Sequence, residues 1–166
     1  MEKDATTERR HRLVMVLDGI LVQVRTVPPD ALQRRSQEGE WTAMELLAHV
    51  AEILPYWAHQ ARELSERSQD GELFGRSTVN PDDDPGRLAA IEGHKGDQLA
   101  AIETLIRTGL TQAVADVRAI QDSKWGRNGT QANGQVTTVA QIVDQRLIGH
   151  LQSHAEQLAR ILQQAQ

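Results

Sequence analysis

Apolar residues recur at steps of three and four along four blocks of this chain, which is the spacing of one buried face of an α-helix. In the first block these residues are Leu13, Val16, Leu17, Ile20, Leu21 and Val24, and Pro28 and Pro29 follow as helix breakers. The pattern therefore predicts four amphipathic helices, which cover approximately residues 7–24, 42–67, 85–120 and 138–162.

Capping signals support three of the predicted helix starts. Thr42-Ala43-Met44-Glu45 and Thr138-Val139-Ala140-Gln141 both fit a capping box, in which a hydroxyl and a longer polar side chain satisfy free amides. Asp84 before Pro85 is typical of an N-cap followed by proline in the first turn. These signals fix the expected starts of the last three helices.

Two features interrupt the helical pattern. Pro55 lies inside the second block, where we expect a bend near Ala51 rather than two helices, because the apolar pattern continues beyond it. Gly93, Gly96 and Gly109 weaken the third block locally, so a break there is compatible with the sequence. The connecting loops are expected at residues 68–84 and 122–135.

The expected fold is all-α: a four-helix bundle with two long connecting loops, formed by residues 1–166 as a single domain. Aromatic residues make up only 3% of the chain, so the core must consist of Leu, Ile, Val and Ala, which favours helices packed on helices. No segment alternates apolar and polar residues for long enough to predict a strand.

Charge and composition exclude several classes of function. The formal net charge is −5 and there is no basic face, so nucleic acid is not an expected partner. No apolar run is long enough to span a membrane and the first residues lack an apolar signal region, which predicts a cytoplasmic protein. Cysteine is absent, so any metal site must be built from His, Asp and Glu.

Two histidines in the last predicted helix are the sharpest chemical signal. His150 and His154 are four residues apart, which places both imidazoles on one helix face about one turn apart. Both fall within the apolar face, where a polar ring nitrogen needs a partner. Such a pair can chelate a divalent metal; the alternative is hydrogen bonding to a buried carboxylate or carbonyl.

His49 is the best candidate for a third imidazole. It lies at the margin of the apolar arc of the second predicted helix, a position that suits a cleft between helices; the alternative is a partly exposed histidine without a role. Three histidines with open coordination positions are the arrangement of many catalytic zinc sites. His11, His59 and His94 lie on polar stretches and are expected at the surface.

Several of these motifs together resemble the DinB-like superfamily. The matching stretches are residues 41–52, with the pattern Thr-x-x-Glu-x-Leu-x-His-Val, and residues 134–162, which contain His-x-x-x-His. Pro55-Tyr56-Trp57 and Phe74-Gly75-Arg76 are also similar to members of that group. The resemblance implies a metal-binding helical bundle that is often a homodimer, with His49, His150 and His154 as the metal ligands.

The resemblance also implies a chemistry. A divalent metal on three neutral imidazoles acidifies a bound water or thiol. The protein is therefore expected to act as a thiol S-transferase that uses a low-molecular-weight thiol on a small electrophile; a hydrolase that uses a metal-bound hydroxide is the alternative. Zinc is favoured, with nickel and iron as alternatives, since three imidazoles suit all of them.

Three further residues are candidates for catalytic roles. Glu52 lies one turn after His49 and is a candidate general base, partner of a ligand histidine or fourth ligand, or else a solvated glutamate. Arg146 lies one turn before His150 and can bind a substrate carboxylate, or form an ion pair with Glu45 or Glu52. Tyr56 can donate a hydrogen bond to a developing anion, or simply pack.

Other aromatic and acidic residues have simpler explanations. Trp57 and Trp125 are expected in the core or in a dimer contact, and residues 82–84, three aspartates, in a solvated loop that ends in a helix cap. Two functions without catalysis remain open: a metal-binding or ligand-binding dimer, and a structural bundle whose histidines satisfy one another.

Overall fold

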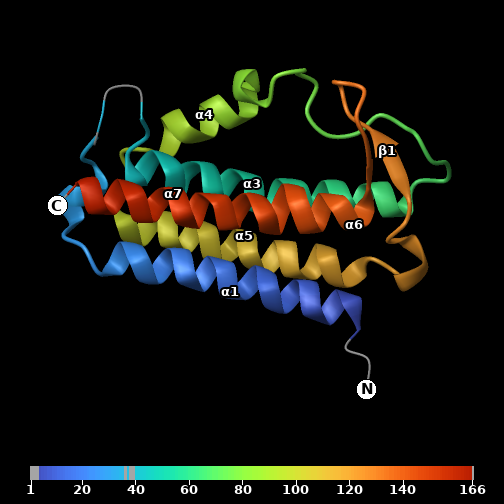
Figure 1. Ribbon diagram of the computed structural model, residues 1–166, viewed down its shortest axis with the longest axis horizontal. Coiled ribbons are helices and arrows are strands. Elements are labelled where there is room, and N and C mark those ends of the chain that lie inside the picture. Colours follow the sequence, from blue (N-terminus) through green and yellow to red (C-terminus); the bar gives the residue numbers. More distant parts are fainter. Residues whose placement is uncertain (1–3, 36, 38–39, 166) are drawn as a thin grey trace.

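The computed structural model describes residues 4–35, 37 and 40–165 and is mostly helical, as predicted. Its long helices lie side by side along the longest axis of the molecule (Figure 1). They are α1 (Ala5–Arg25), α3 (Ala43–Glu66), α5 (Leu99–Ala119) and the continuous run of α6 (Val139–Gln141), η3 (Ile142–Gly149) and α7 (His150–Gln164). The short helical elements are α2 (Pro29–Leu32), η1 (Pro81–Asp83), α4 (Pro85–His94) and η2 (Asp122–Lys124).

Helix α3 is the centre of the packing, because it contacts α5, α4, η3 and α7. Its start is the predicted capping box: the Thr42 hydroxyl accepts from the Glu45 N–H at 3.1 Å, and the Glu45 carboxylate accepts from the Thr42 N–H at 2.8 Å. The helix runs continuously through Pro55. Gly109 of α5 faces that proline, and a Cβ there would lie 3.3 Å from Pro55 Cδ, so glycine allows α5 to approach α3 closely.

The third predicted block is two helices. Helix α4 ends at His94 and α5 begins at Leu99, so the chain breaks in the region that Gly93 and Gly96 weaken. Helix α4 starts at its predicted N-cap, since the Asp84 carboxylate accepts from the Arg87 N–H at 2.9 Å. It lies over α3 on the side away from α1 (Figure 1).

A small β-hairpin corrects the expectation that the chain contains no strand. Strand β1 (Asn128–Thr130) pairs antiparallel with β2 (Val136–Thr138), and Gly134 turns between them with a φ of 83°. Each strand has only three residues, which is too short for an alternating pattern to be visible. Phe74 donates its backbone N–H to the Thr130 carbonyl, so the hairpin also anchors the segment that leads from α3 to α4.

The last helical run is not uniformly α-helical. It starts at the predicted capping box of Thr138 and Gln141, and residues 142–149 then form a π-helix directly before His150. The His150 N–H donates to the carbonyl of Gln145, five residues earlier. Such wide turns are rare and are frequently found at functional sites. Within the described part of the chain, none of the helices combines the length and hydrophobicity needed to cross a bilayer.

Candidate metal centre

The structure brings His49 together with His150 and His154. One ring nitrogen from each of the three side chains lies within 4.8 Å of the others. The ring centroids are 4.9 Å apart for His49 and His154, 5.6 Å for His49 and His150, and 4.5 Å for His150 and His154. Helix α3 provides the first imidazole, and the start of α7 provides the other two, one turn apart on the face that packs against α3.

Several nitrogens of these rings are buried without a hydrogen bond. Among the residues that the structure describes, neither Nδ1 nor Nε2 of His49 has a partner, and neither does Nε2 of His154. The other nitrogen of His154 is satisfied, since Nδ1 lies 3.0 Å from the Gln157 Oε1. A buried polar atom without a partner is costly, so these nitrogens are available to bind a metal ion or a water molecule.

All three imidazoles are held neutral at physiological pH. Burial, together with the nearby His154 and Arg87, lowers the pKa of His49 to about 2. Burial and His154 lower the pKa of His150 to about 4. Burial also lowers the pKa of His154, although its hydrogen bond to Gln157 acts in the opposite direction. Metal ligation requires the neutral imidazole, so these rings need not lose a proton at pH 7 to bind a cation.

Trp41 forms part of the wall of this cluster. Its ring meets His49 edge-on, with ring centroids 5.2 Å apart, and stacks on His154, with ring centroids 6.3 Å apart. An indole excludes water and offers no ligand atom, so it shapes the apolar side of the site.

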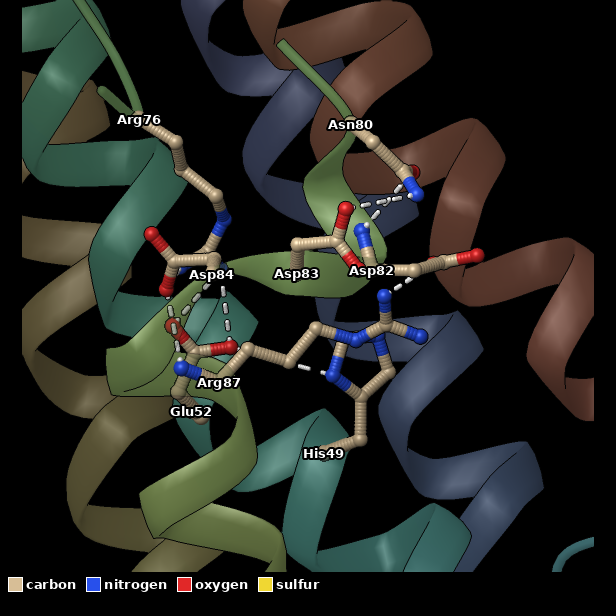
Figure 2. Close-up of polar contacts among 8 residues, drawn as sticks. All are labelled: His49, Glu52, Arg76, Asn80, Asp82, Asp83, Asp84 and Arg87. Atoms are coloured by element: carbon tan, nitrogen blue, oxygen red, sulfur yellow. Dashed lines mark hydrogen bonds and ion pairs between the residues drawn. The ribbon is translucent and has the colours of Figure 1, made fainter. Parts of the chain in front are cut away.

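A buried ion-pair network lies beside His49. Arg76 donates to both carboxylate oxygens of Glu52, at 2.6 and 2.9 Å, and to Asp84 at 2.5 Å (Figure 2). Glu52 Oε2 is also 3.7 Å from His49 Nδ1. Burial raises the pKa of Glu52, and the ion pair with Arg76 opposes this shift. The alternative that Glu52 is a solvated surface residue is wrong, because only 14% of its side chain is exposed.

Tyr56 and Arg146 lie at the edge of the site. The Tyr56 ring packs under the Arg76 guanidinium, whose Cζ is 4.3 Å from the ring centroid, and burial raises the pKa of Tyr56 to about 12. Arg146 donates to Gln135 at 2.6 Å. The alternative of an ion pair from Arg146 to Glu45 or Glu52 is therefore wrong: Glu45 pairs with Arg35 and Glu52 with Arg76.

The remaining histidines and tryptophans are placed as expected. The side chains of His59 and His94 are 56% and 41% exposed, and His11 is exposed as well. Trp57 and Trp125 belong to the hydrophobic core, and Arg9 packs over the Trp125 ring at 4.4 Å. Asp84 caps α4 as predicted, but it is buried in an ion pair rather than solvated.

Sequence reasoning missed four residues that surround the triad: Trp41, Arg76, Arg87 and Gln157. Gln157 had a detectable signal, since it lies three residues after His154 on one helix face. The others come from segments without helical periodicity or from the short helix α4, so only the tertiary structure places them at the site.

Comparison with known proteins agrees with this architecture. A family model described as the DinB superfamily matches residues 5–158, so this chain belongs to the DinB superfamily. Among curated proteins, none matches the chain significantly.

Two solved structures have a similar fold. One is the mycothiol-dependent maleylpyruvate isomerase, and the other is a histidine-to-alanine mutant of that enzyme. They align with TM-scores of 0.70 and 0.71 at 17% sequence identity, over 93% of this chain. This chain spans 61% of the length of the isomerase chain. At 17% identity this similarity shows a shared fold and no more.

Proposed function

We propose that this protein is a metal-dependent enzyme that transfers a low-molecular-weight thiol to a small electrophile. The observation that carries the proposal is the convergence of three histidine nitrogens within 4.8 Å, with buried nitrogens of His49 and His154 that have no hydrogen-bond partner in the described chain. The thiol part is supported by the fold, which a mycothiol-dependent isomerase shares.

His49, His150 and His154 fit a single divalent transition metal. Their donor set is nitrogen only, their rings are neutral, and the buried nitrogens of His49 and Nε2 of His154 have no partner among the described residues. Zinc is favoured for such a set, with nickel and iron as alternatives. When bound, a divalent ion lowers the pKa of a coordinated thiol, so that the thiolate is available at neutral pH.

The neighbouring residues orient and neutralise the site. Glu52 has both oxygens on Arg76 and lies 3.7 Å from His49 Nδ1, so we assign it to neutralising Arg76 and to placing a negative charge beside the His49 ring. Tyr56 is protonated at neutral pH, and burial raises its pKa to about 12, so it serves as a hydrogen-bond donor. Arg146 lies one turn before His150 and supplies a positive charge for an anionic group.

A thiol-consumption assay tests this function. Metal-loaded protein is incubated with mycothiol, bacillithiol or glutathione and a panel of small electrophiles, and free thiol is measured with time. We expect metal-dependent thiol loss that disappears in His150→Ala and persists in His59→Ala, which removes an exposed histidine of α3. Equal thiol loss in the wild type and His150→Ala across the panel would overturn the proposal. Electrophile turnover without thiol would indicate the hydrolase instead.

The proposal includes an assembly. Residues 1–166 form one domain, in which α1, α3, α5 and the run from α6 to α7 constitute a four-helix bundle, and two such chains associate as a homodimer. Light scattering tests the oligomeric state: we expect twice the chain mass of 18.5 kDa. A mass of one chain at working concentration would contradict the homodimer and leave the metal site unaffected.

A further inference from the structure

Arg87 is held in place by the start of α4. Its backbone N–H donates to the Asp84 carboxylate at 2.9 Å, and the same carboxylate accepts from Arg76 at 2.5 Å. Because Arg76 is also fixed by Glu52 of α3, this network ties the first turn of α4 to the helix that carries His49. The position of Arg87 relative to the histidine cluster is therefore set by buried ion pairs.

The side chain of Arg87 extends from α4 toward the three histidines. In Figure 2 it reaches across from its backbone to the region of His49 and Asp82. Its guanidinium Cζ is 5.2 Å from the centroid of the Trp41 ring, the same ring that contacts His49 and His154. Its positive charge lowers the pKa values of all three histidines. Arg87 thus faces the candidate metal centre.

Arg87 has fewer carboxylates in direct contact than Arg76, although it is close enough to Glu52 to lower the pKa of that carboxyl. Arg76 binds two carboxylates whose side chains are only 14% and 11% exposed. Among the described residues, the one carboxylate paired with Arg87 is Asp82, whose side chain is 75% exposed. The Nε of Arg87 is buried and has no hydrogen-bond partner in the described part of the chain, although 14% of the side chain is exposed.

The buried Nε of Arg87 lacks an acceptor beside the candidate metal centre, and an anion would satisfy both this donor and the positive charge. A carboxylate matches the donor fork of arginine in two parallel hydrogen bonds. An entering carboxylate can exchange with Asp82, because an exposed ion pair contributes little stability.

We propose that Arg87 binds a carboxylate of the reactant at the histidine centre, taking it up in exchange for Asp82. The substrates are then small molecules in which the electrophile or the thiol carries a carboxylate. The inference rests on the proposed function for the identity of the centre. It adds the chemical class of the reactant and the residue that selects it.

Cobalt-loaded protein provides a test that does not depend on turnover. Cobalt in place of zinc gives a visible spectrum that responds to anions in the centre, and we titrate acetate with acetamide as the neutral control. Arg87→Gln should weaken acetate binding by at least about tenfold, the value of a charge-assisted hydrogen bond. Asp82→Asn should strengthen it, because the competing carboxylate is gone. Arg118→Gln, which removes the same charge from an exposed position of α5, should leave it unchanged.

The outcomes separate this inference from the proposed function. Equal acetate affinity in the wild type and Arg87→Gln, or no strengthening in Asp82→Asn, overturns the role of Arg87 while the metal site stands. A wild-type protein that takes up no cobalt overturns both. If Arg87→Gln fails to fold, the acetate affinity of Asp82→Asn tests the role of Arg87. This variant is expected to fold, because the Asp82 side chain is exposed.

A kinetic arm identifies the reactant that carries the carboxylate. If the electrophile carries it, Arg87→Gln raises the KM for acidic electrophiles and leaves the KM for their amides and for the thiol unchanged. If the thiol carries it, the KM for the thiol rises instead. Unchanged KM values for both reactants, with kcat also unchanged, contradict the assignment.

Discussion

His154 and Gln157 are joined by a hydrogen bond of 3.0 Å between Nδ1 and Oε1, one turn apart on α7. An amide oxygen accepts, so Nδ1 carries the proton and Nε2 keeps its lone pair. That Nε2 is buried and has no partner within the described chain. The hydrogen bond therefore fixes both the tautomer and the direction of the ring that metal ligation requires.

This relationship predicts a loss of metal affinity when Gln157 is replaced. In Gln157→Ala the His154 ring loses its orienting partner, and zinc affinity should fall about tenfold, the lower range for such partners of ligand histidines. Competition with a chromophoric chelator measures the affinity. Gln152→Ala, at an exposed position of the same helix, is the matched control and should bind zinc as the wild type does. Equal affinities in the two variants would refute this role of Gln157.

The metal-free protein should lose stability as the pH falls below about 6.5, the ordinary pKa of histidine in an unfolded chain. In the folded protein the pKa values of His49 and His150 are lowered to about 2 and about 4, so between these values and 6.5 the unfolded chain binds more protons. Stability is complete above pH 6.5. At pH 5 each of these two histidines should lower the free energy of unfolding by about 2 kcal/mol relative to neutral pH.

Urea unfolding at pH 7.5 and pH 5 in the presence of a chelator measures this pH dependence. His150→Gln removes one of the two contributions, so its loss of stability between the two pH values should be smaller than in the wild type. His59→Gln, which alters an exposed ring, should behave as the wild type. A loss of the same size in His150→Gln and the wild type would contradict the burial of a neutral His150.

Arg76 should be important for stability as well as for the site. Its removal in Arg76→Gln leaves Glu52 and Asp84 as carboxylates without their common partner, in a largely buried position. Breaking such a pair costs about 3 kcal/mol in the free energy of unfolding. The loss should be partly recovered in the double variant Arg76→Gln/Glu52→Gln, which removes one of the stranded charges.

Urea unfolding at pH 7.5 again provides the measurement. Arg25→Gln, which breaks the exposed pair with Glu103, is the matched control and should change the unfolding midpoint far less. If Arg76→Gln shifts the midpoint no further than Arg25→Gln, the network does not anchor α4 to α3.

Trp41 should report metal binding by fluorescence. Its ring lies within 6.3 Å of two of the three imidazoles, so a quenching ion such as Cu²⁺ in the centre should reduce its emission. The stoichiometric part of the quenching should be absent in Trp41→Phe and present in Trp125→Phe. Quenching that persists in Trp41→Phe would place the bound ion elsewhere.

The regular parts of this fold could be predicted from local signals. The capping boxes at Thr42 and Thr138 and the cap at Asp84 are satisfied within a few residues, so the sequence alone reveals them. The hairpin and the π-helix before His150 could not be predicted, because three-residue strands show no alternation and a change of helical period leaves no clear apolar pattern.

The candidate site divides in the same way. The spacing of His150 and His154 predicted that these two act together, and the resemblance to DinB-like proteins added His49; the structure brings the three side chains together. Arg76 and Arg87 could not be assigned, because their place depends on how the segment between α3 and α5 folds back over α3, which is a tertiary effect. The alternative of an ion pair from Arg146 to Glu45 or Glu52 was wrong for the same reason, since Gln135 reaches Arg146 from the hairpin.

The most direct test of the central claim is elemental analysis of untagged protein, purified without chelator and without a nickel resin. We predict about one equivalent of zinc or another transition metal per chain, lost in the alanine variants of His49, His150 and His154 and retained in His59→Ala. An absence of metal from the wild type, together with an unchanged unfolding midpoint on addition of zinc, would contradict the account and leave a helical protein whose histidines have another purpose.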